Sequence, residues 1–277
     1  MNGILIVNKS EGFTSRDVVN KLSKIFNTKK IGHTGTLDPI AKGVLVVVIG
    51  KYTKLCEDLT QTFKEYIATF KLGILTDTLD ITGEILDEKD VTVTEEEIRN
   101  VIAGYKCVYD QEVPIYSSVK INGRKLYEYA RNGENVVLPK RKVDIKNIEV
   151  IDINKDIVKI KCLVSKGTYI RSLIRDIGSS LNTFATMTDL IRIKQGIFDI
   201  SDSYTLEDIE NGNYKLIDIE DVMDIYVIEN DTYLKDVTNG VKLKLDIENK
   251  YILFKHEGNN IALYKKDNDY FRMYIHF

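Results

Sequence analysis

The chain has 277 residues, of which 43% are hydrophobic, and its formal net charge is −3. This length supports a large core, and no apolar run approaches the ~20 residues of a membrane span, so we expect a cytoplasmic protein that does not associate with membranes. Three well-separated cysteines and three scattered histidines match neither a disulfide framework nor a zinc motif, so we expect no disulfide and no metal site.

The charge is unevenly distributed along the chain. Residues 120–142 contain seven basic and two acidic side chains, a local +5, whereas residues 199–248 contain fourteen acids and four lysines, a local −10. Clustered lysine and arginine are typical of a surface that binds a polyanion such as RNA. Two solvated surfaces without any partner would produce the same pattern, so charge alone does not decide between these interpretations.

The chain begins with a predicted strand at residues 4–7 (ILIV). We expect Ser15 to cap the helix that follows, because apolar residues recur at helical spacing through residues 18–26. Next comes the segment KIGHTGTLDPIAKGV at residues 30–44. The apolar run behind it, residues 44–50, predicts a buried strand.

The segment at residues 30–44 combines three glycines with His33 and with Asp38, which precedes a proline. Glycine allows close backbone approach, and proline keeps the preceding residue extended, so the Asp38 carboxylate has a fixed direction. An isolated Asp-Pro pair is most often an ordinary turn. The whole segment, anchored on a buried strand, indicates a functional loop.

Residues 64–73 (KEYIATFKLG) alternate in polarity and predict a strand with Tyr66 on its apolar face, where a tyrosine usually packs in a core. The loop TDTLDITG follows, and its Asp77 and Asp80 lack a third ligand at regular spacing. We therefore interpret them as hydrogen-bond acceptors that brace the loop. Thr94 and Glu97, three residues later, form a capping box for a helix that runs to about residue 103.

Residues 111–136 predict a Pro-Ile-Tyr turn, a short extended piece and a helix that ends at an Asn-Gly pair. Basic residues alternate there with tyrosines, a combination that suits RNA, because lysine and arginine bind phosphates while tyrosine packs or stacks. Residues 143–164 then predict a hairpin.

A helix with a buried stripe follows in SKGTYIRSLIRDIG, and Tyr169 and Arg171 lie off that stripe. By position alone these two would be ordinary surface residues. From about residue 206 the sequence pattern changes and predicts a short helix, an acidic linker and short β-like runs. These runs predict a small separate β domain, with strands at 226–228, 241–245, 251–254, 261–264 and 270–275.

Four of these features occur in the order of a known family: GHTGTLDP, the strand tyrosine, TDTLDITG and GTYIR. They span roughly residues 1–200 and closely resemble the bacterial tRNA pseudouridine synthase B (TruB) family. The resemblance implies an α+β pseudouridine-synthase fold with a large mixed, mostly antiparallel sheet. It also implies a catalytic domain at 1–220, a thumb insertion at about 107–142, and a small C-terminal PUA-like β domain at 221–277.

The resemblance implies isomerisation of uridine 55, in the TΨC loop of tRNA, to pseudouridine, without cofactor or metal. In the family the aspartate of the loop is catalytic, the GTYIR arginine pairs with it, and the strand tyrosine lies against the target base. These roles fall on Asp38, Arg171 and Tyr66. The sequence leaves open whether Asp38 is a nucleophile or the base that removes a sugar proton, and Tyr66 is placed to take the C5 proton.

The substrate-binding residues that we predict share a cationic or flat side chain in a matching segment. His33 would fill the stack vacated by the flipped base, and Tyr169 would pack in the site. The remaining predicted RNA contacts are Lys9, Lys120, Arg124, Arg131 and Arg141.

We expect the T arm of tRNA as partner, a monomer, and no obligate protein partner. The chain departs from the family pattern at Ser10, Val113, Ser118 and Ile191, and we carry over no role from the segment that contains Arg192. Two alternatives remain. An RNA-binding or chaperone protein with an inherited loop would not require Asp38, and a subunit of an RNA-guided synthase is disfavoured by the basic thumb.

Overall fold

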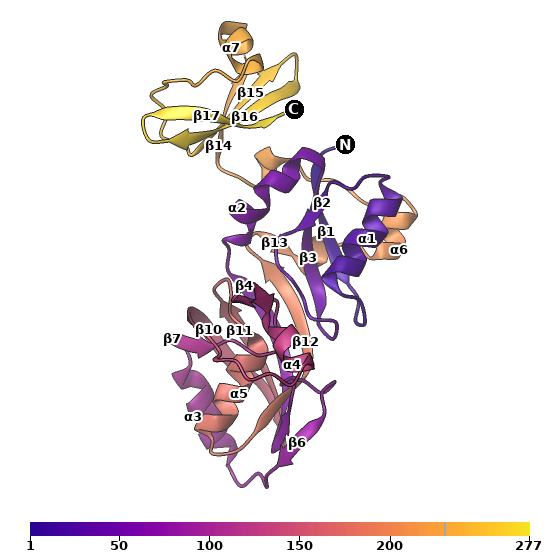
Figure 1. Cartoon of the computed structure of the whole chain (residues 1–277), viewed down its shortest axis with the longest axis vertical. Helices are drawn as coiled ribbons and strands as arrows, with labels where there is room; N and C mark the ends of the chain where they lie inside the picture. The colour runs from indigo at the N-terminus through magenta and orange to yellow at the C-terminus, as the bar shows by residue number, and fades with distance from the viewer. Residues whose placement is uncertain (230) are drawn as a thin grey trace.

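The computed structural model of the chain describes residues 1–229 and 231–277. It contains a nine-stranded sheet and a separate four-stranded sheet near the C-terminus (Figure 1). The strands of the large sheet are β1 (Gly3–Lys9), β2 (Ile31–His33), β3 (Lys42–Ile49), β4 (Lys64–Leu72), β7 (Val108–Glu112), β10 (Lys140–Asn154), β11 (Ile157–Val164), β12 (Ala185–Gln195) and β13 (Phe198–Asp199).

The strand order along the large sheet is β1-β3-β12-β4-β11-β10-β7, with β2 beside β3 and β13 beside β12. All neighbours are antiparallel except β12 and β3, which run parallel. At that junction Arg192 lies opposite Gly43, whose φ is +96°, and a Cβ on Gly43 would lie 2.3 Å from the Arg192 carbonyl oxygen. Glycine therefore lets the two halves of the sheet meet directly behind the predicted functional loop.

The helices are short and lie around the sheets. They are α1 (Ser15–Ile25), α2 (Cys56–Thr60), α3 (Glu95–Gly104), α4 (Leu126–Arg131), α5 (Ile170–Ser180), α6 (Leu206–Glu210) and α7 (Leu234–Thr238), with 3₁₀ turns η1 (Gly50–Leu55), η2 (Ile200–Asp202), η3 (Ile219–Asp221) and η4 (Asp231–Tyr233). The predicted capping box of α3 is confirmed. None of the described helices is long and apolar enough to cross a membrane.

The predicted cap of α1 was wrong by one residue. Thr14 is the N-cap and forms a capping box with Asp17, because its hydroxyl accepts from the Asp17 N–H while the Asp17 carboxylate accepts from the Thr14 N–H. Ser15 is the first helical residue, and its buried hydroxyl bonds the backbone of Leu37. The serine therefore ties α1 to the predicted functional loop.

Strand β3 is buried on both faces, which explains its unbroken apolar sequence. Leu45, Val47 and Ile49 belong to the main core of the large sheet. On the opposite face, Val44, Val46 and Val48 pack in a second core that includes side chains from the C-terminal sheet. The loop that precedes β3 is thus anchored on a strand with no solvent-facing side.

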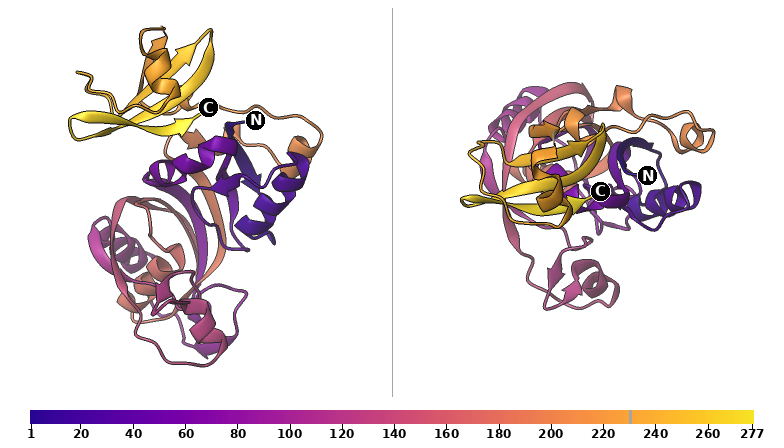
Figure 2. Two further views of the ribbon diagram at one scale, coloured as in Figure 1. Left: turned by 45° about the horizontal axis from the view of Figure 1, so that its top comes forward. Right: turned by 90° about the horizontal axis from the view of Figure 1, so that it is seen from above.

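The C-terminal sheet consists of β14 (Ile225–Glu229), β15 (Tyr251–His256), β16 (Asn259–Asp267) and β17 (Tyr270–His276), in that order. Figures 1 and 2 show it stacked beside the N-terminal strands. Four of the five predicted runs are strands. The prediction of a strand at 241–245 was wrong, because Leu243 alone forms an isolated bridge, with Phe271, after α7 ends.

A second contact fixes the C-terminal sheet to α2. The Asp58 carboxylate accepts hydrogen bonds from the hydroxyls of Tyr251 and Tyr274 at 2.6 and 2.9 Å. The ammonium groups of Lys250 and Lys265 lie 3.2 and 3.3 Å from the same carboxylate. The side chain of Asp58 is only 12% exposed, so four donors from the C-terminal sheet and its approach converge on one largely buried anion.

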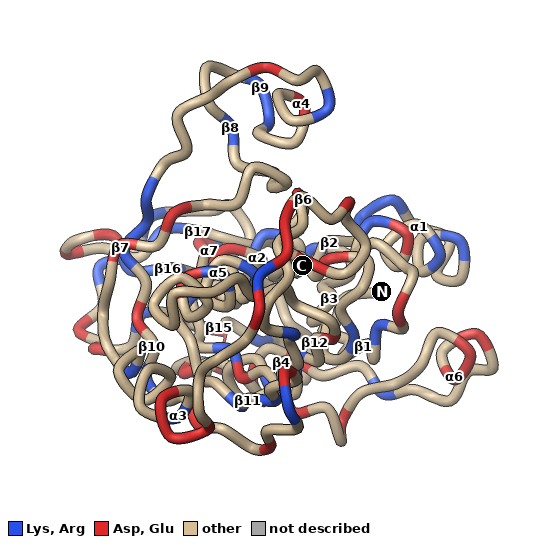
Figure 3. The backbone as a smooth tube through the Cα atoms, turned by 90° about the horizontal axis from the view of Figure 1, so that it is seen from below, with Lys and Arg blue, Asp and Glu red and all other residues tan. Residues whose placement is uncertain are grey.

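The thumb, which we define as residues 113–139, leaves the large sheet between β7 and β10. It contains β8 (Lys120–Ile121), β9 (Arg124–Lys125) and α4, and it projects from the body of the protein (Figure 3). Residues 108–112 and 140–142, which the predicted insertion included, are strand residues of the large sheet. The hairpin of β5 (Ile74–Thr76) and β6 (Ile85–Glu88) carries the TDTLDITG loop.

Candidate active site

Asp38 lies in the loop between β2 and β3, where several backbone contacts hold it. Its carbonyl accepts from Ala41 N at 3.0 Å, and the preceding Leu37 is fixed by Ser15. The Asp38 side chain is 35% exposed. The loop therefore presents one accessible carboxylate on a rigid support.

Asp38 opens onto a cleft of about 360 Å³, which falls within the ~300–1,000 Å³ typical of small-molecule sites. The functional loop, β4, the thumb, the first turn of α5 and β12 all contribute to it. The lining residues include Thr36, Asp38, Lys64, Tyr66, Tyr116, Ser117, Tyr127, Tyr169, Arg171, Leu190 and Arg192. Segments far apart in the sequence thus converge on one carboxylate, as the predicted pairing of the loop with GTYIR required.

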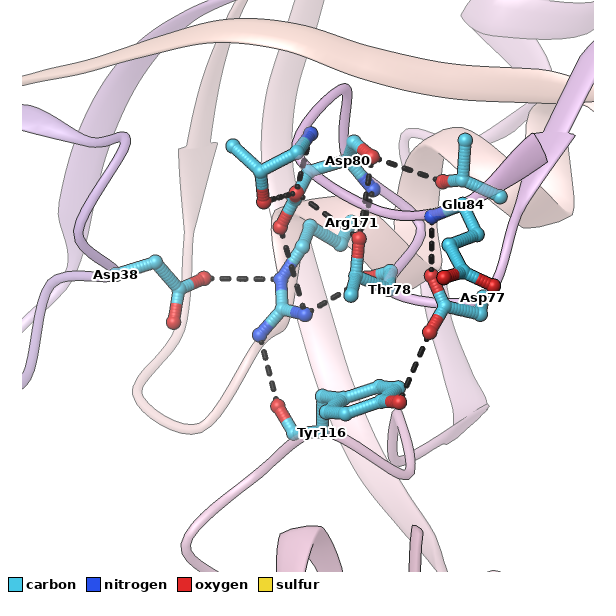
Figure 4. Close-up of polar contacts among 9 residues, drawn as sticks. Asp38, Asp77, Thr78, Asp80, Glu84, Tyr116 and Arg171 are labelled. Atoms are coloured by element: carbon cyan, nitrogen blue, oxygen red, sulfur yellow. Dashed lines mark hydrogen bonds and ion pairs between the residues drawn. The ribbon is translucent and has the colours of Figure 1, made fainter. Parts of the chain in front are cut away.

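Arg171 is the buried partner of Asp38. Its Nε lies 2.9 Å from Asp38 Oδ2, and the guanidinium is only 5% exposed. The Nε–H is not aligned for a hydrogen bond to this oxygen, so the contact is an ion pair. Nη1 donates to the Thr78 carbonyl at 2.8 Å and lies 3.8 Å from Asp80, while Nη2 donates to the Tyr116 carbonyl at 3.0 Å (Figure 4).

The predicted bracing role of the two loop aspartates is confirmed. Asp77 accepts from the Glu84 N–H at 2.9 Å, and Asp80 accepts from the backbone and hydroxyl of Thr82 at 3.1 and 2.5 Å. The loop they stabilise supplies the Thr78 carbonyl that Arg171 binds. Bracing the loop therefore also fixes the cation beside Asp38.

Tyr66 and Arg192 face each other across neighbouring strands β4 and β12. Arg192 is 1% exposed, and its Nη1 donates to the Tyr66 hydroxyl at 3.4 Å. Its other donors bind the carbonyls of Val44 at 2.6 Å and Gly35 at 3.0 Å. Sequence reasoning assigned Arg192 no role, although its position in phase with the buried Leu190 was a signal that this arginine points inward.

Comparison with known proteins adds to this geometry. Residues 23–170 match the family described as "TruB family pseudouridylate synthase (N terminal domain)", and residues 171–241 match "tRNA pseudouridylate synthase B C-terminal domain". The tRNA pseudouridine synthase B of Clostridium tetani is 44% identical over 96% of this chain and 93% of that protein. The corresponding protein of Caldicellulosiruptor saccharolyticus is 39% identical over 98% of this chain and 100% of that protein.

The chain belongs to the TruB family of pseudouridylate synthases. It is therefore an isomerase, as the resemblance implied. Solved structures agree with the TruB fold: a chain in the Cbf5-Nop10-Gar1 complex aligns with a TM-score of 0.69 at 26% identity, covering 95% of this chain and 78% of that chain. A chain from an H/ACA RNP bound to a substrate RNA containing 2′-deoxyuridine gives 0.70 at 24% identity, covering 99% and 83%.

Lys9 has a different position in this TruB structure from the one we predicted. It is fully buried, and its ammonium group donates to the carbonyls of Ser10, Phe13 and Pro39. Burial lowers the pKa of Lys9 to about 8, with Arg192 acting in the same direction and Asp38 opposing it. Lys9 therefore braces the loop from inside rather than lining the cleft.

His33 lies at the end of β2 beside the loop, and its Nδ1 accepts weakly from Gly35 N at 3.4 Å. Burial lowers the pKa of His33, and the charges of Arg192 and Arg16 lower it further, so the imidazole is neutral at pH 7. A neutral, flat ring suits the stacking role that we predict for His33.

Tyr169 lines the cleft, and a buried residue that sequence reasoning missed holds its backbone. The amide oxygen of Gln111 accepts from Tyr169 N at 2.8 Å, and the amide nitrogen donates to the Tyr109 hydroxyl at 2.7 Å. Lys64 also lines the cleft, and burial, followed by the charges of Arg192 and Lys166, lowers its pKa to about 8. Gln111 and Lys64 both lie near strand ends, and the sequence gives no sign of which residues they contact there.

The predicted basic contacts lie on the thumb and at its root (Figure 3). Lys120, Arg131 and Arg141 are exposed. Arg124 pairs with Glu134 at 2.8 Å within the thumb and stacks 4.4 Å above the Tyr129 ring. In the described part of the chain, no three His, Cys, Asp or Glu side chains lie close enough together to hold a metal ion.

Proposed function

We propose that this chain isomerises uridine 55 in the TΨC loop of tRNA to pseudouridine, with Asp38 as the catalytic group. The observation that carries the proposal is the Asp38–Arg171 ion pair at the wall of a cleft of about 360 Å³. The similar proteins of Clostridium tetani and Caldicellulosiruptor saccharolyticus are both named tRNA pseudouridine synthase B. We propose that the reaction uses no cofactor, because it is a redox-neutral rearrangement within one nucleotide.

The reaction breaks the bond between N1 of uracil and C1′ of ribose and forms a bond between C5 and C1′. We propose that Asp38 either attacks the sugar or removes the neighbouring sugar proton, while Arg171 keeps the carboxylate oriented. The proton on C5 leaves after the base has rejoined, and N1 gains a proton. The Tyr66 hydroxyl, 3.4 Å from the Arg192 guanidinium, is our candidate acceptor for the C5 proton.

RNA would approach from the basic thumb side. A target within a folded loop must be flipped out of its stack, which costs a few kcal/mol. We propose that His33 compensates by filling the stack, that Tyr169 packs against the flipped nucleotide, and that Lys120, Arg124, Arg131 and Arg141 contact phosphates. Lys9 is omitted from these contacts because it is buried.

We further propose a catalytic domain at 1–220 and a PUA-like domain at 221–277, supported by the two separate sheets. The protein would act in the cytoplasm as a monomer without an obligate protein partner. A solved chain of the same fold comes from the Cbf5-Nop10-Gar1 complex, which supports the alternative of a synthase subunit in a multi-protein assembly. Activity of the purified chain on tRNA alone separates the two hypotheses.

The test uses purified protein and an unmodified tRNA transcript, with pseudouridine mapped by nucleotide. Asp38→Asn keeps the shape of the side chain but removes the charge, so we expect conversion to stop while tRNA binding stays near normal. A turnover within about tenfold of the parent, roughly 1.4 kcal/mol in the barrier, would falsify a direct role of Asp38. Modification at a different uridine would instead contradict the proposed position.

Tyr66→Phe tests the proton acceptor separately. Phenylalanine keeps the ring and removes only the oxygen, so tRNA binding should survive. Release of tritium from C5-labelled uridine should fall by about 10²-fold or more, the range for a lost acid–base group. Parental tritium release would show that the proton leaves by another route and that Tyr66 only packs against the base.

A further inference from the structure

The thumb has few polar connections to the body of the protein. In residues 1–229 and 231–277, every hydrogen bond or ion pair that joins residues 114–138 to the rest of the chain involves Tyr116. The other polar contacts of the thumb, such as Arg124–Glu134, are internal. Leu126 is fully buried, yet it belongs to none of the protein's apolar clusters. Beyond its two strand ends, the polar contacts that join the thumb to the body are therefore, among the described residues, those of Tyr116 alone.

The hydroxyl of Tyr116 donates to Asp77 Oδ2 at 2.8 Å. The Asp77 side chain is oriented by a second contact, because its other oxygen accepts from the Glu84 N–H at 2.9 Å. That oxygen lies so close to Gly83 that a Cβ there would be 2.3 Å away. The hydrogen bond to Asp77 raises the pKa of Tyr116, which keeps the phenol a neutral donor. A fixed carboxylate thus meets a donor carried by the thumb.

The backbone of the same tyrosine reaches the catalytic charge. Arg171 donates to the Tyr116 carbonyl with one guanidinium nitrogen while another lies against Asp38 (Figure 4). Because the guanidinium is almost wholly buried, it has no solvent to replace a lost partner. The position of the thumb and the position of the catalytic cation are consequently set by one shared group.

We propose that Tyr116 and Asp77 form a latch that seats the thumb and thereby completes the placement of Arg171 against Asp38. Both are positioning residues, since they act through Arg171 rather than on the nucleotide. Ser117 and Tyr127 of the thumb line the cleft together with Tyr116, so a nucleotide bound in the cleft would lie beside this latch. The catalytic consequence rests on the proposed function, whereas the seating of the thumb does not.

The seating is tested without RNA by limited trypsin digestion, following cleavage within residues 120–131 by mass spectrometry. Tyr116→Phe removes only the hydroxyl donor. Asp77→Asn removes the negative charge of the side chain that accepts its hydrogen bond. We expect each to accelerate thumb cleavage at least tenfold with little change in Tm, because proteolysis reports the population of the opened segment. The double variant should be no faster than the singles, since both remove one interaction.

Tyr105→Phe is the matched control. It removes a phenol hydroxyl that bonds Ser180 outside the thumb, so cleavage should stay parental. Parental thumb cleavage in Tyr116→Phe and Asp77→Asn would overturn the latch. Strict additivity in the double variant would also overturn it, because two independent effects would then be present.

The catalytic consequence is tested by single-turnover conversion of the tRNA transcript at saturating enzyme. We expect a rate loss of about tenfold or more in both latch variants, with tRNA affinity within about threefold of the parent, because small misplacements of reacting groups cost up to ~100-fold. Fast thumb cleavage with parental conversion would overturn the link to Arg171. A parent protein that makes no pseudouridine would contradict the proposed function, and the latch would still be decided by the digestion.

Discussion

The thumb and the C-terminal sheet are both appendages of the large sheet, but they are attached in opposite ways. The C-terminal sheet shares an apolar core with β1 and β3 and adds the four donors around Asp58. The thumb makes polar contacts with the body through Tyr116 alone among the residues described. The charges differ as well, since the thumb segment at 120–142 is basic, whereas residues 225–277 contain eight acidic and eight basic side chains and carry no net charge.

This difference separates a fixed part from a movable one. An apolar interface cannot open without exposing buried area to water, at ~25 cal/mol per Å². A single hydrogen bond to a charged group, such as that from Tyr116 to Asp77, contributes a net ~1.5–3 kcal/mol. If the latch proposal holds, the thumb is the part that opens at least cost, on the side where RNA is proposed to enter, whereas the strand behind the Asp38 loop is buried on both faces.

The largest expected effect comes from truncating a buried leucine in the core shared with the C-terminal sheet, compared with the same change in the thumb. Leu253→Ala removes a fully buried side chain from the core that β3 shares with the C-terminal sheet. We expect it to lower the free energy of global unfolding by about 2–5 kcal/mol. Leu126→Ala makes the same change in the thumb, outside those clusters, and should alter global unfolding by less than about 1 kcal/mol. Urea denaturation followed by circular dichroism measures both.

An equal loss of global stability in the two alanine variants would break the comparison, because the thumb would then belong to the same cooperative unit as the body. Thumb digestion by trypsin provides the complementary readout. It should respond to the Leu126 change and not to the Leu253 change under native conditions.

The next effect concerns the charges. Replacing Lys140, Arg141 and Lys142 with glutamine should weaken binding of all RNAs by tenfold or more and flatten the salt dependence, because each phosphate contact releases counterions with a slope of ~0.7–0.9. The matched control replaces three lysines of the acidic region, Lys235, Lys242 and Lys244, and should leave the slope unchanged. Equal slopes for the two triple variants would mean that the thumb root does not face RNA.

The smallest effect concerns the carboxylate that fastens the C-terminal sheet. Burial would raise the pKa of Asp58, but hydrogen bonds from Tyr251, Tyr274 and Lys250 and the charge of Lys265 outweigh it and lower this pKa. Since the folded pKa is the lower one, this stabilisation is present above the unfolded value of ~3.9 and is lost as pH falls through the folded value.

Asp58→Asn should therefore cost about 1 kcal/mol at pH 7 and give a flatter stability curve below about pH 4. Thermal unfolding between pH 3 and 7 measures it. If the stability of Asp58→Asn falls with decreasing pH as steeply as that of the parent, other carboxylates dominate the loss of stability in acid.

Much of this structure follows from local sequence patterns. The alternation in β4, the capping box of α3 and the hairpin of β10 and β11 depend on neighbours close in sequence, and all were predicted. The meeting of Asp38 with Arg171 was predicted from a resemblance carried by two motifs. Neither periodicity nor charge would have brought those residues together.

The contacts that sequence analysis missed depend on how strands and loops far apart in the sequence pair with one another. Arg192 reaches Tyr66 and Gly35 only because β12 joins β4 on one side and β3 on the other. Gln111 meets Tyr169 across two elements that are far apart in sequence. Lys9 looked like a surface contact because its burial is created by the loop that folds over it. A single sequence does not contain these registers.

The two-sided burial of β3 has a consequence for synthesis on the ribosome. Its outer face, Val44, Val46 and Val48, is covered in part by Tyr251, Leu253, Leu263 and Ile275. At ~5–20 residues per second, translation from Ile49 to Tyr251 takes on the order of 10–40 s. During that interval the nascent chain carries an incompletely covered apolar strand next to the loop that holds Asp38. We expect chaperones to engage this strand, which crosslinking of stalled ribosome complexes before and after residue 251 would detect.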